Sequence, residues 1–92
     1  MAVKILIPTP LRQYVDHQKT VEVHGATVAE ALEDLVKRHA AMRKHLLDEA
    51  GAVRSFVNIY VNDEDIRHLE NSGTSLGADD VISIIPSVAG GR

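Results

Sequence analysis

The sequence predicts an α+β domain in which four or five strands pack against one main helix. Three observations carry this prediction. Short segments of alternating apolar and polar residues lie toward both ends of the chain, which is typical of half-buried strands. One stripe of apolar residues at helical spacing lies between them. The length of 92 residues allows a single modest core and leaves no room for a second domain.

Two strands are predicted before the helix. Residues 3–7 alternate and end at Pro8, which lacks the amide that a central strand needs. Thr20–His24 alternates as cleanly, so the two segments indicate a hairpin with a long connection. The connection, residues 9–19, is polar and contains Pro10, and we expect it to be a loop with little regular structure.

The main helix is predicted to begin at Thr27 and to end near Leu46. Thr27 and Glu30 have the spacing of a capping box, in which a hydroxyl and a carboxylate bind the free amides of the first turn. An apolar stripe follows at steps of four and three: Val28, Leu32, Leu35, His39, Met42 and Leu46. The opposite face has two pairs of opposite charge at i,i+4, Glu33 with Lys37 and Asp34 with Arg38.

Two or three further strands are predicted after the helix. Residues 56–61 alternate, with Val57, Ile59 and Val61 on one face. We expect a turn at residues 62–65, the start of a short fourth strand at residues 66–67, and a loop at residues 68–77. Val81–Pro86 is a short apolar run closed by a proline, which indicates a buried final strand.

The last six residues are predicted to form a flexible tail, so the folded domain is expected to span residues 1–86 and the tail residues 87–92. The tail ends in Gly90, Gly91 and Arg92. Without Cβ atoms a Gly-Gly backbone can enter a narrow cleft, and its carbonyl carbon is open to attack. Such an end suits a protein whose own carboxylate reacts, although a frayed terminus would explain the composition as well.

One face of the predicted sheet is left without cover. A single helix covers one face, yet Leu6, Phe56, Tyr60 and some of Ile82, Ile84 and Ile85 cannot all point toward it. An exposed apolar sheet face usually marks a docking surface. We therefore expect Leu6, Phe56 and Tyr60 to contact a partner, with scattered surface hydrophobes or a homodimer contact as the alternatives.

The composition excludes several classes of function. The chain has no cysteine, so disulfides, thiolate nucleophiles and cysteine-bound metal centres are ruled out. A net charge of −3 gives no support to nucleic-acid binding. No segment has the length of a membrane span or the character of a signal peptide, so a cytoplasmic location without membrane contact is expected. If the protein handles sulfur, the C-terminal carboxylate is the group left to carry it.

The polar clusters do not indicate catalysis or metal binding. The five histidines lack the spacing of metal-ligand motifs, and His39 is interpreted as a partly buried residue of the helix stripe. Residues 63–65 are acidic but lack the spacing and the glycine of a calcium loop, so a solvated turn is favoured. Asp79 and Asp80 are interpreted as turn formers. We expect neither enzyme activity nor a bound metal.

The order of the elements and the glycine pair resemble the ubiquitin-like β-grasp fold, which implies a mixed sheet. Residues 56–67, FVNIYVNDEDIR, resemble the central strand and turn of the ThiS/MoaD family of sulfur carriers. Residues 79–91, DDVISIIPSVAGG, resemble the final strand and tail of that family. Residues 3–12 and the overall length are most similar to the CysO-like carriers of cysteine biosynthesis.

This resemblance implies a carrier and not an enzyme. A partner of the ubiquitin-activating type would use ATP and magnesium to adenylate the carboxylate of Gly91, and a sulfur donor would convert it to a thiocarboxylate. Val88, Ala89 and Gly90 would thread the tail into the partner. A cysteine synthase with pyridoxal phosphate would receive the sulfur, and a zinc-dependent hydrolase would release the product. These cofactors belong to the partners, and this chain is expected to bind none.

Arg92 departs from the family pattern, because with it present the terminal carboxylate belongs to arginine. Either Arg92 is removed first, or it is artificial, or the chain is not a carrier. Two other functions stay open: a ubiquitin-like modifier joined to lysines through Gly91, and a plain interaction domain with an inert tail.

Overall fold

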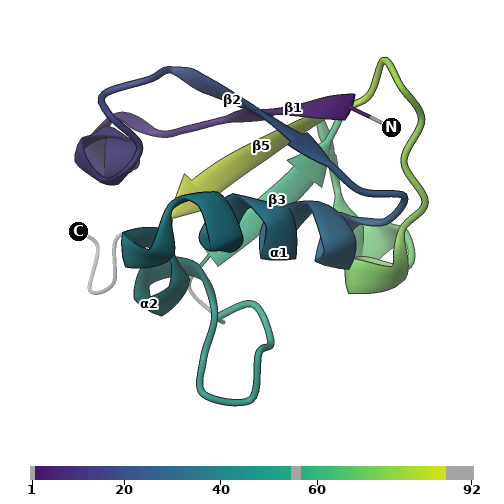
Figure 1. Ribbon diagram of the computed structural model, residues 1–92. Helices are drawn as coiled ribbons and strands as arrows, with labels where there is room; N and C mark the ends of the chain where they lie inside the picture. The colour runs from purple at the N-terminus through teal and green to yellow at the C-terminus, as the bar shows by residue number, and fades with distance from the viewer. Residues whose placement is uncertain (1, 55–56, 87–92) are drawn as a thin grey trace.

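The computed structural model describes residues 2–54 and 57–86, and within them the chain forms a five-stranded mixed sheet with one main helix across one face (Figure 1). The strands are β1 (Ala2–Leu6), β2 (Thr20–His24), β3 (Val57–Val61), β4 (Glu64–Asp65) and β5 (Val81–Pro86). Their order is β2-β1-β5-β3-β4, in which β1 and β5 run parallel and the other neighbours antiparallel. This is the predicted β-grasp topology.

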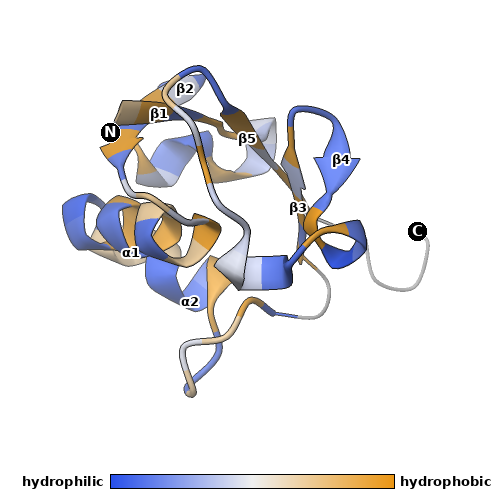
Figure 2. Ribbon diagram, turned by 90° about the vertical axis from the view of Figure 1, so that its right-hand side faces the viewer, coloured by the Kyte–Doolittle hydropathy of each residue, from blue (hydrophilic) through white to orange (hydrophobic). Residues whose placement is uncertain are grey.

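The core lies between the sheet and α1 (Val28–Arg38). Alternation along the strands points every second side chain at the helix. The buried strand residues are Val3, Ile5, Val21, Val23, Val57, Ile59, Val61, Ile82 and Ile84. The helix contributes Val28, Ala31, Leu32, Leu35 and Val36. Figure 2 shows α1 alternating between hydrophilic and hydrophobic residues along its length, as expected for a helix with one buried face.

The start of α1 is capped as predicted. The Thr27 hydroxyl accepts a hydrogen bond from the Glu30 amide at 3.2 Å, and the Glu30 carboxylate accepts one from the Ala26 amide at 2.9 Å. On the outer face, the expected pair of Asp34 with Arg38 is confirmed at 3.0 Å.

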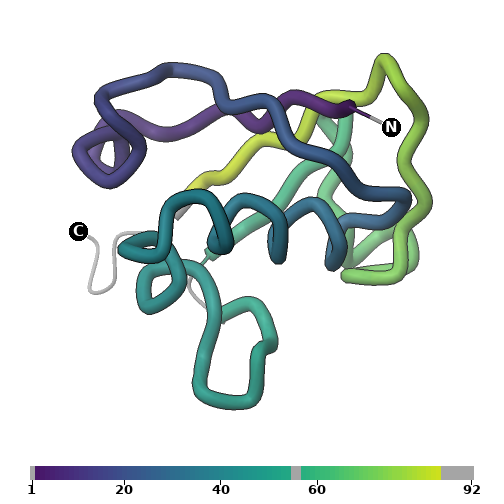
Figure 3. The backbone as a smooth tube through the Cα atoms, viewed as in Figure 1, coloured from purple at the N-terminus to yellow at the C-terminus, as the bar shows by residue number. Residues whose placement is uncertain are grey.

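The main helix is shorter than predicted. It ends at Arg38, since His39 has φ −132° and ψ 81°, and the chain turns into η2 (Ala40–Met42) and α2 (Arg43–Leu46), as the tube in Figure 3 shows. A straight helix to Leu46 would be about 29 Å long, whereas a five-residue strand spans about 17 Å. The break folds Met42 and Leu46 back into the core, where both are fully buried.

The same turn changes one predicted ion pair. Glu33 binds Arg43 at 3.1 Å instead of Lys37, because the chain after α1 folds back beside the helix. The i,i+4 spacing of Glu33 and Lys37 therefore predicted the wrong partner for the glutamate.

Two predicted loops contain short helices. Residues 9–19 include η1 (Thr9–Tyr14), a 3-10 helix with Pro10 in its first turn, where a proline amide is not needed. Leu11 and Val15 of this segment are buried, so the expectation of little regular structure was wrong. The predicted loop of residues 68–77 includes η4 (Asn71–Gly73).

The turn after β3 joins it to a very short fourth strand. Asn62 and Asp63 have φ of 50° and 75°, which are the left-handed conformations of a two-residue hairpin loop. The fourth strand is therefore Glu64–Asp65, two residues earlier than predicted, and Ile66–His68 forms the 3-10 helix η3.

The start of β5 is fixed by side chains of the preceding turns. The Asn62 side chain accepts a hydrogen bond from the Val81 amide at 2.9 Å and donates one to Asp80 at 2.8 Å. Asp80 also accepts one from the Gly77 amide at 2.7 Å, and these two bonds lower the pKa of its carboxyl group. Asp80 is thus a turn-forming residue, as predicted.

Candidate functional site

The sheet face away from α1 carries a small apolar area around the second half of β5. We call Leu6, Tyr60, Ser83 and Ile85 the outer patch. Ser83 pairs with Leu6 on one side and with Tyr60 on the other, and Ile85 follows on the same face of β5. Leu6 is 44% exposed and Ile85 is 46% exposed, while Tyr60 is half-buried. The patch therefore presents apolar surface that nothing in the described chain covers.

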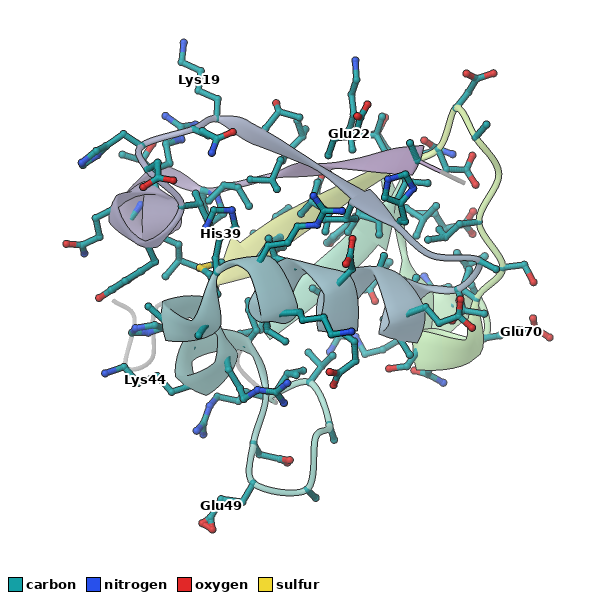
Figure 4. All side chains as sticks on the ribbon, in the orientation of Figure 1. Lys19, Glu22, His39, Lys44, Glu49 and Glu70 are labelled. Carbon is teal, nitrogen blue, oxygen red and sulfur yellow. The ribbon has the colours of Figure 1, made fainter. Side chains whose placement is uncertain are left out.

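The rest of this face in the described strands is mostly polar, with Ala2 and Val81 as half-buried apolar residues. Lys4 and Glu22 pair in register on β1 and β2, and Figure 4 shows Glu22 pointing away from α1. Ile82 and Ile84, which the sequence left unassigned, point to the helix side and are buried. The apolar area is thus limited to one part of the face, as for a specific contact and unlike scattered surface hydrophobes.

The strand β5 places this patch next to the chain's last segment. It pairs with β1 on one side and β3 on the other, so it lies at the centre of the sheet. Its last residue is Pro86. Residues 87–92 follow directly, so the covalent chain connects the patch to the predicted reactive end.

Six predicted site residues lie outside the described residues. They are Phe56, Val88, Ala89, Gly90, Gly91 and Arg92. Leu6 and Tyr60 are on the predicted face, and the docking role predicted for Leu6, Phe56 and Tyr60 stays a prediction.

Beside the patch, an arginine is held in place by two side chains. Arg67 of η3 binds the Asp65 carboxylate, with Nη2 to Oδ2 at 2.6 Å and Nε to Oδ1 at 3.1 Å. Its Nη2 also donates to Asn58 Oδ1 at 2.8 Å. Asp65 accepts a further bond from the Arg67 backbone amide at 2.8 Å, which caps η3.

These contacts strongly favour the charged forms of both groups. Hydrogen bonds from the Arg67 side chain, and then from its backbone amide, lower the pKa of Asp65 to about 2. The same contact raises the pKa of Arg67. Sequence reasoning took Asp65 as part of a solvated turn and did not single out Arg67. The local signal was the Asp-x-Arg spacing, in which an aspartate can cap the turn that follows it.

The histidines do not converge. Within residues 2–54 and 57–86, no three His, Asp or Glu side chains lie close enough to hold a metal ion. His39 is half-buried where α1 ends, and its backbone amide donates to the Leu35 carbonyl at 2.9 Å. His45 stacks on Tyr14 with ring centroids 4.3 Å apart. In the same described part, no helix is long and apolar enough to cross a bilayer.

The mixed sheet, the single main helix and the patch beside the end of β5 define a ubiquitin-like β-grasp protein. The particular group follows from comparison with known proteins. The model of the ThiS family matches residues 5–91, and the chain belongs to this family. The predicted relationship is therefore confirmed.

Known relatives match along the whole chain. The sulfur carrier protein CysO of Mycobacterium tuberculosis is 39% identical over 93 residues, which cover 99% of this chain and all of the relative. The crystal structure of the Amycolatopsis orientalis BexX/CysO complex contains a chain that superposes with a TM-score of 0.88 and 40% identity, covering 97% of this chain and 99% of that one.

A second kind of relative is a protein modifier. The small archaeal modifier protein 3 of Haloferax volcanii is 33% identical over 66 residues, which cover 72% of this chain and 71% of the relative. The relatives are thus named for two of the three functions considered, the sulfur carrier and the protein modifier.

Proposed function

We propose that this protein is a sulfur carrier and that Gly91 is the residue that carries the sulfur. The observation that most favours this function is the full-length similarity to a protein named a sulfur carrier, 39% identical over 99% of the chain. The protein itself would not be an enzyme; it would be the substrate of an activating enzyme. Its contribution would be a recognisable surface and an accessible carboxylate.

The proposed chemistry takes place on the carboxylate of Gly91. A carboxylate oxygen attacks the α-phosphorus of ATP on the activating enzyme, and pyrophosphate leaves with its magnesium. The resulting acyl adenylate is a good electrophile. A sulfide equivalent attacks the carbonyl carbon, the bond from carbon to the AMP oxygen breaks, and a thiocarboxylate remains. Val88, Ala89 and Gly90 would pass through the enzyme's cleft, which small residues fit best.

The outer patch would be the surface that the activating enzyme recognises. Leu6 and Ile85 present apolar surface, and Tyr60 adds an aromatic side chain of the type that anchors interfaces. Because the patch includes Ile85, near the end of strand β5, an enzyme seated on it would receive the tail without any change in the fold.

The sulfur is proposed to serve cysteine synthesis, because the matching relative and the solved complex both carry the name CysO. The acceptor would be a cysteine synthase that supplies the pyridoxal phosphate. A zinc-dependent hydrolase would then release the product from Gly91. No cofactor is assigned to this chain in this scheme.

Arg92 must leave before the chemistry can begin, and this step gives the test. Forms ending at Arg92 and at Gly91 are incubated with the activating enzyme, ATP and sulfide, and the intact mass is measured. Replacement of oxygen by sulfur on the shorter form alone is the expected result. Conversion of the arginine-ended form without loss of a residue would show that Gly91 is not the reacting residue, and conversion of neither form would refute the carrier function.

A protein modifier is the second candidate, and the similarity to small archaeal modifier protein 3 favours it. In that function the Gly91 carboxylate would form an isopeptide bond with a lysine of a target. Mass spectrometry of proteins purified from the host separates the two functions. Thiocarboxylate on Gly91 supports the carrier, and lysines bearing a Gly-Gly remnant support the modifier. Full function after deletion of residues 90–92 would leave only an interaction domain.

A further inference from the structure

A cleft of about 370 Å³ lies at the edge of the sheet, beside β3. It exists because β4 pairs only with Tyr60 and Val61, after which the chain turns into η3. On the side where β4 lies, no described strand pairs with the first residues of β3. The lining of the cleft includes the apolar residues Val57, Ile59 and Ile66 and the charged residues Arg54, Asp65 and Arg67.

The charged group that a partner would meet at this cleft is Arg67. Its side chain is 63% exposed, whereas the Asp65 side chain that holds it is 10% exposed. The bonds to Asp65 and Asn58 use Nε and Nη2, so a guanidinium group with five N–H donors keeps donors on its exposed side. The buried carboxylate orients the arginine without blocking it.

This arrangement costs the protein side-chain entropy before any partner arrives. Arginine has a long side chain with large rotamer entropy, so holding it in one geometry is unfavourable by itself. Ordering the side chain in the free protein removes that cost from a later binding step. The network therefore presents Arg67 to a partner in an orientation that is already fixed.

A second arginine, Arg54, is among the residues that line the cleft. The Arg54 Nε donates to the Lys44 backbone carbonyl at 2.8 Å, so this side chain is also held. An oriented guanidinium group, that of Arg67, beside an apolar floor fits a carboxylate that arrives on an apolar protein surface. The net charge of −3 argues against a polyanion such as nucleic acid, which the chain as a whole would repel.

We propose that this cleft binds a carboxylate side chain of the activating enzyme, with Arg67 as the binding residue and Asp65 and Asn58 as positioning residues. The cleft lies at the edge of the sheet near the outer patch. Asn58, one of its lining residues, is on the same face of β3 as Tyr60, whereas Val57 and Ile59 point to the helix side. The identity of the partner rests on the proposed function. The carboxylate would fix the angle at which the enzyme sits on the patch.

The test uses the enzyme that converts the Gly91-ended protein in the assay above. The dissociation constant of the complex between this enzyme and the protein is measured by calorimetry at low and at high salt. The proteins compared are the unchanged protein and the variants Arg67→Gln, Arg67→Lys, Asp65→Asn and Tyr60→Ser. Arg67→Gln should weaken binding about 10- to 100-fold, as for loss of hydrogen bonds to a charged group. Arg67→Lys should restore part of the loss, because lysine keeps the charge but not the two-pronged geometry.

Asp65→Asn should weaken binding less than Arg67→Gln and make it more sensitive to salt, since the arginine keeps its charge but is no longer held. The matched control is Arg38→Gln, another exposed arginine paired with an aspartate, on the outer face of α1. It should bind normally. Thermal unfolding of each variant shows that the fold is intact.

The outcomes separate this inference from the proposed function. Normal binding by Arg67→Gln together with weak binding by Tyr60→Ser would overturn the carboxylate site and leave the carrier function in place. A loss for Arg67→Gln that is the same at both salt concentrations would also overturn it, because an ionic contact is screened by salt. If the unchanged protein does not bind the enzyme, the proposed function and this inference both fail.

Discussion

Replacing exposed apolar residues of the outer patch should weaken binding of the activating enzyme by an amount that the structure allows us to estimate. Fully burying a leucine or isoleucine side chain is worth about 1.5–3 kcal/mol. Leu6 and Ile85 are 44% and 46% exposed, so docking can bury a little under half of each. Leu6→Ser or Ile85→Ser should therefore cost roughly 0.7–1.4 kcal/mol of binding free energy, about three- to tenfold in the dissociation constant.

The assay is calorimetric titration of the Gly91-ended protein with the activating enzyme. Tyr60→Ser is predicted to cost more, on the order of 1–3 kcal/mol, as for an aromatic anchor. Leu69→Ser is the matched control, since Leu69 is 37% exposed but lies between two 3-10 helices and outside the sheet. Thermal unfolding checks that no variant has lost its fold.

Two results would refute the reasoning. An equal loss at Leu69 and at the patch residues would show that the effect is not local to the sheet face. Normal affinity of the double variant Leu6→Ser, Ile85→Ser, with a functional enzyme, would show that this face does not dock at all.

Three further predictions concern the tail, a glycine and the buried carboxylate. Gly91→Ala in the form ending at residue 91 should slow thiocarboxylate formation severely, seen by intact mass, without changing the melting temperature, because the added methyl crowds the attacked carbonyl. Gly25→Ala should destabilise the fold by about 1–3 kcal/mol in chemical denaturation, since its Cβ would lie 2.5 Å from backbone of α1; Gly73→Ala, where no atom lies within 4 Å, should be close to neutral. Because Asp65 has a lowered pKa, its stabilising effect should be complete above about pH 4 and be lost as the pH falls toward 2. The difference in unfolding free energy between the unchanged protein and Asp65→Asn should therefore shrink on acidification, and a constant difference would contradict the assignment.

The strands could be predicted from the sequence because their signal is local. In β2, Val21 and Val23 alternate with polar residues, and the same alternation sets which side faces the helix. The capping box of Thr27 and Glu30 is equally local, since both hydrogen bonds form within one turn. Such features need no knowledge of the rest of the chain.

Features that depend on how distant segments meet could not be predicted in this way. The helix breaks at His39 because a longer helix would extend beyond the sheet. The helical spacing of Met42 carries no information about the length of the sheet. The same is true of the Glu33 partner, because Arg43 reaches it only after the break. The bond from Arg67 to Asn58 joins η3 to β3 and required the hairpin turn to be placed correctly.

The length of the tail limits where an activating enzyme can dock. From Pro86 to Gly91 the chain has five residues, which span at most about 17 Å when fully extended. The enzyme's active site must therefore lie within that distance of the end of β5. The outer patch satisfies this limit, because Ile85 precedes Pro86 directly. Leu6 of the adjacent strand β1 pairs with Ser83, three residues before Pro86, which places Leu6 about 11 Å from the end of β5. The outer face of α1 lies on the other side of the core from the patch. The tail would have to pass around the sheet to reach an enzyme seated there. The proposed chemistry at Gly91 thus requires a docking surface close to the end of β5, and the exposed apolar side chains are found there.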